Sequence, residues 1–282
     1  MQTVHTIAAL REQVARWREA GESVALVPTM GNLHRGHLRL VEQARGHARR
    51  VVATVFVNPL QFGEGEDFGR YPRTLAEDQA RLETAQCDLL FAPDEAQIYP
   101  DGRDDLSRVV APRAFAELEG AHRPGHFDGV ATVVSILFNL VQPDIALFGE
   151  KDYQQLQLIR RMVADLHMPI SIVGVATERE DDGLALSSRN QYLGPEQRRK
   201  APALHAALSA VAAGLRGGRR DFEALCREQF EALAGQGFEP QYVAIRRPDL
   251  RPSEAGDTEF VVLAAAVLGT TRLIDNLRAE AV

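Results

Sequence analysis

The sequence has little cysteine. Cys87 and Cys226 are its two cysteines, they stand far apart, and neither belongs to a CxxC pair or a Cys/His cluster. No disulfide framework and no zinc site are therefore indicated. Both side chains are expected to be reduced, buried thiols.

Basic residues and long apolar runs are also scarce. With 32 Lys and Arg against 39 Asp and Glu, the net charge is −7, which leaves no overall basic surface for a nucleic acid. The most apolar stretches, 130–141 and 260–268, are too short to span a bilayer. The first 22 residues are typical of an amphipathic surface helix and not of a signal peptide. We therefore expect a cytoplasmic protein with no nucleic-acid or membrane partner.

Short β-branched runs alternate with longer amphipathic runs in the first two thirds of the chain. The strands are predicted at 24–27, 51–57, 89–91, 145–148 and 170–175, and the helices at 37–48, 74–85, 130–141 and 153–166. This alternation predicts an α/β protein with a Rossmann-like, doubly wound parallel sheet covered on both faces. Ligands of such sheets bind at the carboxyl ends of the strands.

The pattern changes after about residue 188. Two helices, 195–215 and 221–234, are followed by strands at 241–246, 259–268 and 271–275, with a hairpin indicated at Gly-Thr-Thr 269–271. The length of 282 residues favours two domains. We expect a Rossmann-like domain at 1–185 that binds nucleotide and acid, and a smaller α+β domain at 186–282 that covers the active site.

The segment 58–71 fits neither pattern. Its sequence, NPLQFGEGEDFGRY, contains three glycines and no helical or strand period. A loop of this length predicts a lid or a binding loop.

A histidine pair follows the first predicted strand. His34 and His37 stand where the chain enters a helix, with Gly31 and Gly36 permitting close approach of the backbone. The helix N-terminus favours phosphate, and two imidazoles three residues apart can point at the same oxygens. Surface histidines or a metal site are the alternatives for an isolated His-x-x-His. The position after the first strand of a doubly wound sheet favours a nucleotide site.

Six segments resemble, in the same order, the signatures of the pantothenate synthetase family. They are PTMGNLHRGH at 28–37, FVNPLQF at 56–62, YPRT at 71–74, LEGAHRPGHFDGV at 118–130, VQPDIALFGEKDYQQL at 141–156 and DGLALSSRNQYL at 182–193. The HxGH element is shared with the wider nucleotidyltransferase superfamily, whereas FGEKDYQQL together with LSSRN is specific to this family. The resemblance implies condensation of (R)-pantoate with β-alanine through a pantoyl-adenylate, with ATP as co-substrate, Mg²⁺ and a homodimer.

The resemblance also implies which residues contact ATP. His34 and His37 would support the phosphates, with His37 as the matched proton donor, and Lys151 would offer a mobile cation. The implied catalytic residues are His34, His37, Lys151, Ser187, Ser188 and Arg189. The implied nucleotide-binding residues are these six with Pro28, Thr29, Met30, Gly31, Asn32, Leu33, Arg35, Gly36, Gly149, Glu150, Asp152, Glu178 and Leu186.

Two of these segments also have a purely structural interpretation. Without a ligand nearby, Lys151 and Asp152 would form a solvated ion pair. As an isolated string, Ser-Ser-Arg-Asn at 187–190 would be a turn or a helix cap.

The resemblance implies a separate set of residues for pantoate and for Mg²⁺. Gln61 and Gln155 would hold pantoate, because an amide both donates and accepts hydrogen bonds, and Gln61 would also face β-alanine. Asn58 and Arg123 are further substrate-binding candidates, with a surface role as the alternative for Arg123. The candidates for Mg²⁺ are Asp78 and Glu77, whose alternative is the acidic first turn of a helix.

Two other functions stay open at this point. A nucleotidylyltransferase would release the same pyrophosphate but keep the nucleotide in its product, so free AMP distinguishes it. A non-catalytic nucleotide-binding module need not keep groups aimed at a leaving pyrophosphate, and the intact HxGH, GEKD and SSRN strings argue against it. The chain has no G-x-S-x-G or Walker A string, which agrees with a mechanism without an enzyme nucleophile.

Overall fold

The computed structural model describes residues 1–281, which form two compact units. The first unit comprises Met1–Glu150 and Leu158–Ala176, and the second comprises Lys151–Gln157 and Thr177 onward. The short segment Lys151–Gln157 thus groups with residues from Thr177 onward, which follow it after the segment Leu158–Ala176. Among residues 1–281, every helix is too short or too polar to cross a membrane.

The first unit contains a six-stranded sheet in the order β1-β4-β3-β2-β5-β6, and every described strand pair in it is parallel. This confirms the predicted doubly wound α/β sheet. The sequence pattern did not indicate β1, a strand of three residues at the edge of the sheet. The strands are β1 (Gln2–Val4), β2 (Val24–Thr29), β3 (Arg50–Val55), β4 (Leu89–Phe91), β5 (Ile145–Gly149) and β6 (Ser171–Val175).

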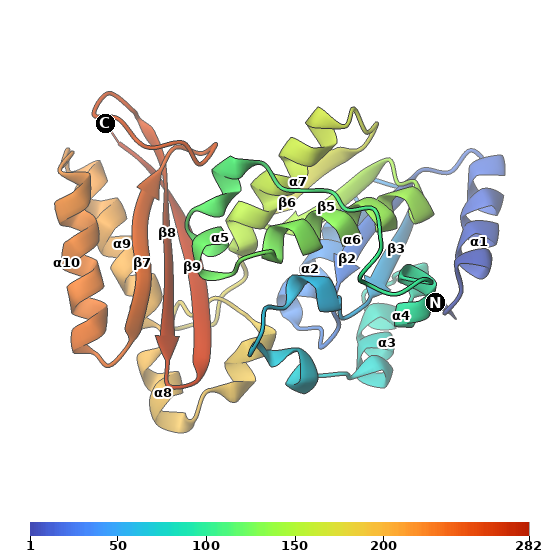
Figure 1. Ribbon diagram of the computed structural model, residues 1–282, viewed down its shortest axis with the longest axis horizontal. Helices are drawn as coiled ribbons and strands as arrows, with labels where there is room; N and C mark the ends of the chain where they lie inside the picture. Colours follow the sequence, from blue (N-terminus) through green and yellow to red (C-terminus); the bar gives the residue numbers. More distant parts are fainter. Residues whose placement is uncertain (282) are drawn as a thin grey trace. The chain divides into compact units, whose positions relative to one another are not determined.

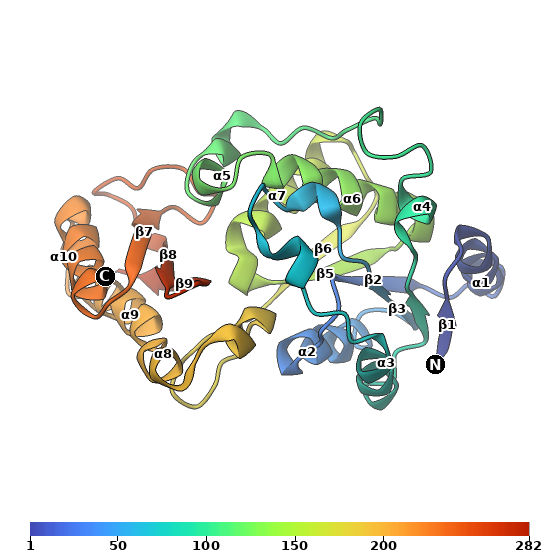
Figure 2. The ribbon, with the colours of Figure 1, turned by 60° about the horizontal axis from the view of Figure 1, so that its bottom comes forward.

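Helices cover both faces of this sheet. Figure 2 shows α2 and α3 on one face and α6 on the other. The central strand β2 begins with four fully buried apolar residues because both of its faces are covered. The helices are α1 (Ile7–Glu19), α2 (Arg35–Ala44), α3 (Leu75–Thr84), α4 (Glu95–Ile98), α5 (Glu119–His122), α6 (His126–Val141) and α7 (Tyr153–Asp165), and short 3₁₀ turns lie at Pro59–Gln61, Asp67–Arg70, Arg113–Ala116 and Glu150–Asp152.

The second unit contains a three-stranded antiparallel sheet in the order β7-β8-β9, with α9 and α10 beside it (Figure 1). This confirms the predicted smaller α+β unit. Its elements are a 3₁₀ turn at Ser188–Tyr192, α8 (Pro195–Lys200), α9 (Ala203–Arg216), α10 (Phe222–Gly235), β7 (Glu239–Arg246), β8 (Glu259–Leu268) and β9 (Thr271–Glu280).

Two features of the second unit refine the sequence prediction. The predicted helix 195–215 is two helices, because Pro202 cannot donate the backbone hydrogen bond that a continuous helix needs. The hairpin predicted at 269–271 is present: Leu268 pairs with Thr271, and Gly269 takes a φ of 64° in the turn.

Candidate active site

The paired histidines begin helix α2 in the first unit. His34 is the N-cap, and its Nδ1 accepts a hydrogen bond from the backbone N–H of Gly36 at 3.2 Å. His37 Nδ1 accepts one from the N–H of His34, also at 3.2 Å, and the two ring centroids are 4.0 Å apart. The two imidazoles therefore form a capping box. Because an accepting ring nitrogen carries no proton, each neutral ring keeps its N–H at Nε2. Both histidines are thus set up as Nε2–H donors.

The turn before the histidines depends on glycine. Gly31 has a φ of 83°, and a Cβ at this position would lie 3.0 Å from Asp78 Oδ2 and 3.0 Å from Val55 Cγ1. Asn32 follows with a φ of 49°. Only glycine combines this backbone conformation with such close neighbours. The turn from β2 into α2 therefore requires glycine both for its backbone conformation and for its close packing against Val55 and Asp78.

Asp78 on α3 holds the same turn through hydrogen bonds. Its carboxylate is fully buried; Oδ2 accepts from Asn32 N at 2.9 Å and from Thr74 Oγ1 at 3.2 Å, and Oδ1 accepts from Leu33 N at 2.7 Å. Arg81 Nη1 of the same helix donates to Leu33 O. Asp78 thus fixes the loop that leads to the histidines.

The metal hypothesis for Asp78 and Glu77 gains no support from these contacts. Asp78 already accepts three hydrogen bonds, and Glu77 is exposed at the next helical position, about 100° away around the helix. Residues 1–281 contain no group of three or more His, Cys, Asp or Glu side chains placed to hold a metal ion.

The Asp78→Asn substitution should lower the free energy of unfolding by about 2 to 3 kcal/mol, since an amide cannot accept from both loop N–H groups and loses the charge that strengthens them. Urea unfolding measures the difference. Asp165→Asn is the matched control, because Asp165 pairs with Arg161 on the exposed surface of α7 and should cost about 0.5 kcal/mol or less. Equal unfolding midpoints for the two variants would contradict the role of Asp78.

Gln61 contacts Met30 in the loop that leads to the paired histidines. Its Nε2 donates to Met30 Sδ at 2.9 Å, and its Oε1 accepts from Asn58 Nδ2 at 3.1 Å. Gln61 is 9% exposed. The structure therefore brings together two of the predicted ligand-contacting residues, Met30 and Gln61.

Asn58 uses its full hydrogen-bonding capacity within the protein. Besides Gln61, its Nδ2 donates to Gly129 O at 3.1 Å, and its Oδ1 accepts from Tyr99 Oη at 2.7 Å and from Leu60 N at 3.2 Å. Burial raises the pKa of the Tyr99 hydroxyl, which keeps it a donor. The observed contacts make Asn58 the support of Gln61, and direct contact with substrate stays a prediction.

Gly129 in α6 permits this arrangement. A Cβ there would fall 2.2 Å from Leu60 O, inside the backbone of the Pro59–Gln61 turn. A glycine inside an otherwise apolar helix is the sequence signal for such close approach of another backbone.

Arg123 holds the loop 62–71 rather than standing alone at the surface. Its Nε and Nη2 donate to the two oxygens of Glu66 at 2.7 and 2.6 Å, and its Nη1 donates to His126 Nε2 at 3.0 Å. His126 Nδ1 then donates to Gln61 O at 2.8 Å, because arginine can only donate and fixes the tautomer of the imidazole. Burial alone would raise the pKa of Glu66, but the hydrogen bond and charge of Arg123 lower it below its usual value. The cluster ties the predicted lid loop to the backbone of Gln61.

The stability of the protein should depend on the protonation of His126. Burial and the charge of Arg123 lower the pKa of His126 from 6.5 to about 4. The unfolded chain therefore binds the proton more readily, so the neutral imidazole contributes stability above pH 6.5 that is lost as the pH falls toward 4. That difference in pKa corresponds to about 3 kcal/mol.

Urea unfolding of the wild-type protein and His126→Gln between pH 7 and pH 4 tests this expectation. The wild-type protein should lose about 3 kcal/mol more than the variant over this interval. Parallel losses would show that His126 is not the titrating group.

The GEKD motif begins where β5 ends at Gly149. Glu150 belongs to the first unit, and Lys151 and Asp152 belong to the second. The Lys151 side chain is 18% exposed, and its Nζ is 4.0 Å from Asp152 Oδ2. This distance is at the outer limit for an ion pair, and most of the Lys151 side chain is shielded from solvent. A solvated ion pair with Asp152 therefore describes Lys151 poorly. Gln155 lies in the first turn of α7.

The Ser187–Arg189 segment in the second unit follows a small hairpin. Leu186 N donates to Glu178 O at 2.9 Å, and Arg179 and Ala185 form an antiparallel bridge. Ser187 then caps the 3₁₀ turn Ser188–Tyr192, with Oγ accepting from Arg189 N at 3.2 Å. The helix-cap alternative is therefore realised at Ser187.

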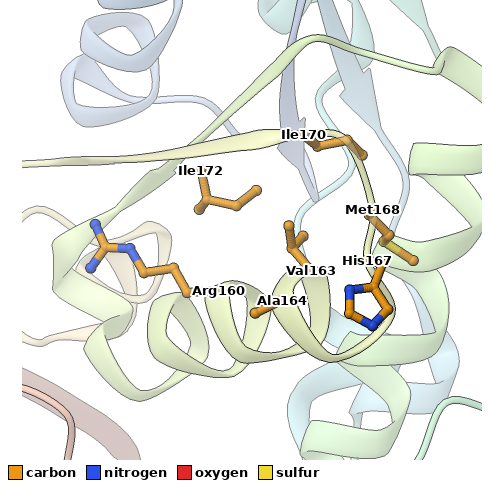
Figure 3. A pocket seen from close by; sticks show the side chains of 7 residues that line it. All are labelled: Arg160, Val163, Ala164, His167, Met168, Ile170 and Ile172. Carbon is orange, nitrogen blue, oxygen red and sulfur yellow. The ribbon is translucent and has the colours of Figure 1, made fainter.

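The cavity shown in Figure 3 is separate from these residues. It measures about 570 Å³ and lies between the second half of α7 and the start of β6 in the first unit, with mostly aliphatic walls. A smaller cavity of about 280 Å³ lies at the carboxyl ends of β2 and β3 and includes Met30, Gly31 and Asp78. The smaller one occupies the end of the sheet where ligands of doubly wound folds bind. The lining of the larger one is Arg160, Val163, Ala164, His167, Met168, Ile170 and Ile172.

Comparison with known proteins identifies the family. The family model of pantoate–β-alanine ligase matches residues 2–278. The pantothenate synthetase of Thioalkalivibrio sulfidiphilus is 59% identical over 278 residues, covering 98% of this chain and 97% of that protein, and the one of Pseudomonas putida KT2440 is 58% identical with the same coverage.

Two solved structures are similar over nearly the whole chain. The crystal structure of pantothenate synthetase from Thermus thermophilus has 52% identity and a TM-score of 0.91, covering 98% of this chain and 99% of that one. The pantoate–β-alanine ligase from Francisella tularensis, in complex with β-γ ATP and β-alanine, has 32% identity and a TM-score of 0.83, covering 98% and 97%. This chain therefore belongs to the pantoate–β-alanine ligase family.

Proposed function

We propose that the protein joins (R)-pantoate to β-alanine with ATP as co-substrate, and that it releases AMP and pyrophosphate through a pantoyl-adenylate. It is a ligase that forms an amide bond, as its family membership establishes. The observation that carries the adenylate step is the pair of Nε2–H donors at the N-terminus of α2. The Francisella relative, with β-γ ATP and β-alanine bound, supports both as ligands here.

The chemistry requires activation of the acid. A carboxylate accepts an amine poorly because oxide is its leaving group. In the proposed first step a pantoate carboxylate oxygen attacks the α-phosphorus of ATP, the bond between this phosphorus and the α,β-bridging oxygen breaks, and pyrophosphate leaves. The β-alanine amine then attacks the acyl carbon, loses a proton and displaces AMP.

The residues of each unit have distinct tasks in this proposal. In the first unit, His34 and His37 donate from Nε2 to phosphate oxygens as charge develops, and the N-terminus of α2 adds its dipole. In the second unit, Lys151 and the Ser187–Arg189 segment balance the charge of the leaving pyrophosphate. No step requires an enzyme nucleophile.

The acid is proposed to bind Gln61 and Gln155 through amide hydrogen bonds. Asn58 keeps Gln61 oriented, and the Arg123 and Glu66 pair holds the loop 62–71. A closed loop would protect the reactive mixed anhydride from water.

Three further parts of the proposal rest on the family resemblance. Mg²⁺ would accompany ATP and offset phosphate charge, with no carboxylate of this chain assigned to it. We also propose a homodimer and a cytoplasmic location.

The function is tested by measuring AMP formed from ATP with pantoate alone, β-alanine alone and both acids together. We expect repeated turnover to AMP, with pantothenate in equal amount, only when both are present. A product that retains the nucleotide would instead indicate a nucleotidylyltransferase.

A further inference from the structure

Strand β9 of the second unit carries two adjacent buried polar residues, Asp275 and Asn276, which are 4% and 7% exposed. Neighbouring residues of a strand point to opposite faces of the sheet. Asp275 shares its face with Leu273 and Ala279, which belong to the apolar core of this unit. A carboxylate in a core is costly unless its charge is compensated, so its partners indicate why it is there.

Arg179 compensates that charge. Its Nη1 and Nη2 donate to the two oxygens of Asp275 at 2.7 and 2.9 Å, a bidentate pair. His205 Nδ1 of α9 lies 3.4 Å from Oδ2. Burial would raise the pKa of the Asp275 carboxyl, but His205 and Arg179 together lower it below its usual value. Asp275 is therefore a fixed negative charge against which Arg179 is held.

Arg179 in turn fixes the hairpin that precedes the Ser187–Arg189 segment. Its Nη1 donates to Gly183 O in the hairpin turn at 3.0 Å, and its Nη2 donates to Asn276 O at 3.1 Å. The bridge between Arg179 and Ala185 closes the hairpin two residues before Ser187. The turn has little freedom beside α9, since a Cβ at Gly183, whose φ is 92°, would lie 2.8 Å from His205 Cδ2.

Asn276 holds the other candidate nucleotide-binding segment of this unit. Its Nδ2 donates to Lys151 O at 2.8 Å. Its own N–H donates to Asp275 Oδ1 at 2.8 Å. Two consecutive residues of β9 thus anchor Lys151 on one side and the hairpin before Ser187 on the other.

We propose that Asp275 is a positioning residue for ATP, which sets the place of the Ser187–Arg189 segment through Arg179, while its neighbour Asn276 sets the backbone of Lys151. Asp275 itself touches no substrate in this scheme. The inference rests on the proposed function, because it takes Lys151 and Ser187–Arg189 as nucleotide ligands.

The first test compares Asp275→Asn with a matched control in the same unit, Asp257→Asn. Asp257 also accepts from an arginine and from a backbone N–H, Arg247 Nε at 2.7 Å and Glu254 N at 2.7 Å, but within the loop between β7 and β8. We expect Asp275→Asn to raise the KM for ATP by about 10-fold to 10²-fold, since small misplacements at a reacting centre have effects of this size. The KM for β-alanine should not change, and Asp257→Asn should change neither constant.

The second test asks whether Asp275 acts through Arg179. In Arg179→Gln combined with Asp275→Asn, the KM for ATP should be no higher than in the worse single variant, because the two substitutions break the same connection. Asn276→Ala removes no charge and provides a folded alternative if the Asp275 variants do not accumulate. It should raise the KM for ATP and leave the KM for β-alanine unchanged.

The outcomes separate this inference from the proposed function. If wild-type protein makes no AMP from ATP, pantoate and β-alanine, the proposed function fails. If wild-type protein is active and both Asp275→Asn and Asn276→Ala keep its KM for ATP while only lowering the melting temperature, the two residues are structural and the positioning inference is wrong. Effects of Asp275→Asn and Arg179→Gln that multiply in the double variant would also overturn it.

Discussion

Replacing His37 by alanine should slow adenylate formation by about 10²-fold or more. The Nε2–H of His37 is fixed because Nδ1 accepts from the backbone N–H of His34. Alanine removes both the proposed phosphate donor and the acceptor that completes the cap of α2. Pyrophosphate release with ATP and pantoate measures the rate, and pantoate binding should survive because Gln61 is held by Asn58 and Met30.

Two further substitutions separate catalysis from helix capping. His37→Gln keeps an acceptor for the His34 N–H and adds an amide donor, since glutamine is an ordinary residue at this capping-box position. It should therefore retain more activity than His37→Ala. His47→Ala is the control, because His47 is exposed just beyond the other end of α2. Near-wild-type pyrophosphate release from His37→Ala would refute the assignment.

Replacing Lys151 by alanine should lower the rate of pyrophosphate release by about 10²-fold and weaken ATP binding, because in the proposed mechanism its ammonium group meets the developing phosphate charge. Lys151→Arg should restore little of it, since a planar guanidinium does not replace a compact ammonium in a confined position. The chain contains only two lysines, Lys151 and Lys200, although it has 32 basic residues in all.

This composition supplies both a control and a second readout. Lys200 is 44% exposed and pairs with Glu196 in α8, so Lys200→Ala should be active. An amine-specific reagent can modify few sites in this protein, and ATP should protect Lys151 from it while leaving Lys200 reactive. Full activity of Lys151→Ala, or equal labelling of both lysines with and without ATP, would remove Lys151 from the mechanism.

The sequence predicted the parallel sheet because buried parallel strands are recognisable as short apolar runs between amphipathic helices. The last strand was predicted at 271–275, which is too short, because β9 continues to Glu280. The polar pair Asp275 and Asn276 resembles a strand end in the sequence. In the structure both residues are buried, because their partners Arg179 and Lys151 come from distant parts of the chain.

The entry into α2 with its paired histidines was predictable from local sequence. Gly31 and the two histidines build their turn and cap within ten residues, so the motif indicates its own conformation. Asp78 could not be assigned in this way. An acidic first turn of a helix has the same sequence pattern whether it serves a metal, the helix dipole or a distant loop. Only the packing of α3 against the turn at Asn32 and Leu33 distinguishes the last of these.

Positional isotope exchange tests the adenylate mechanism most directly. ATP labelled with ¹⁸O in the α,β-bridge is incubated with the protein, Mg²⁺ and pantoate, and the label is followed into the non-bridge positions of the β-phosphate. We predict exchange that requires pantoate but not β-alanine, because pyrophosphate forms, rotates and returns before the amine is used. Exchange that appears only when β-alanine is present would contradict the stepwise mechanism, even if the final product is pantothenate.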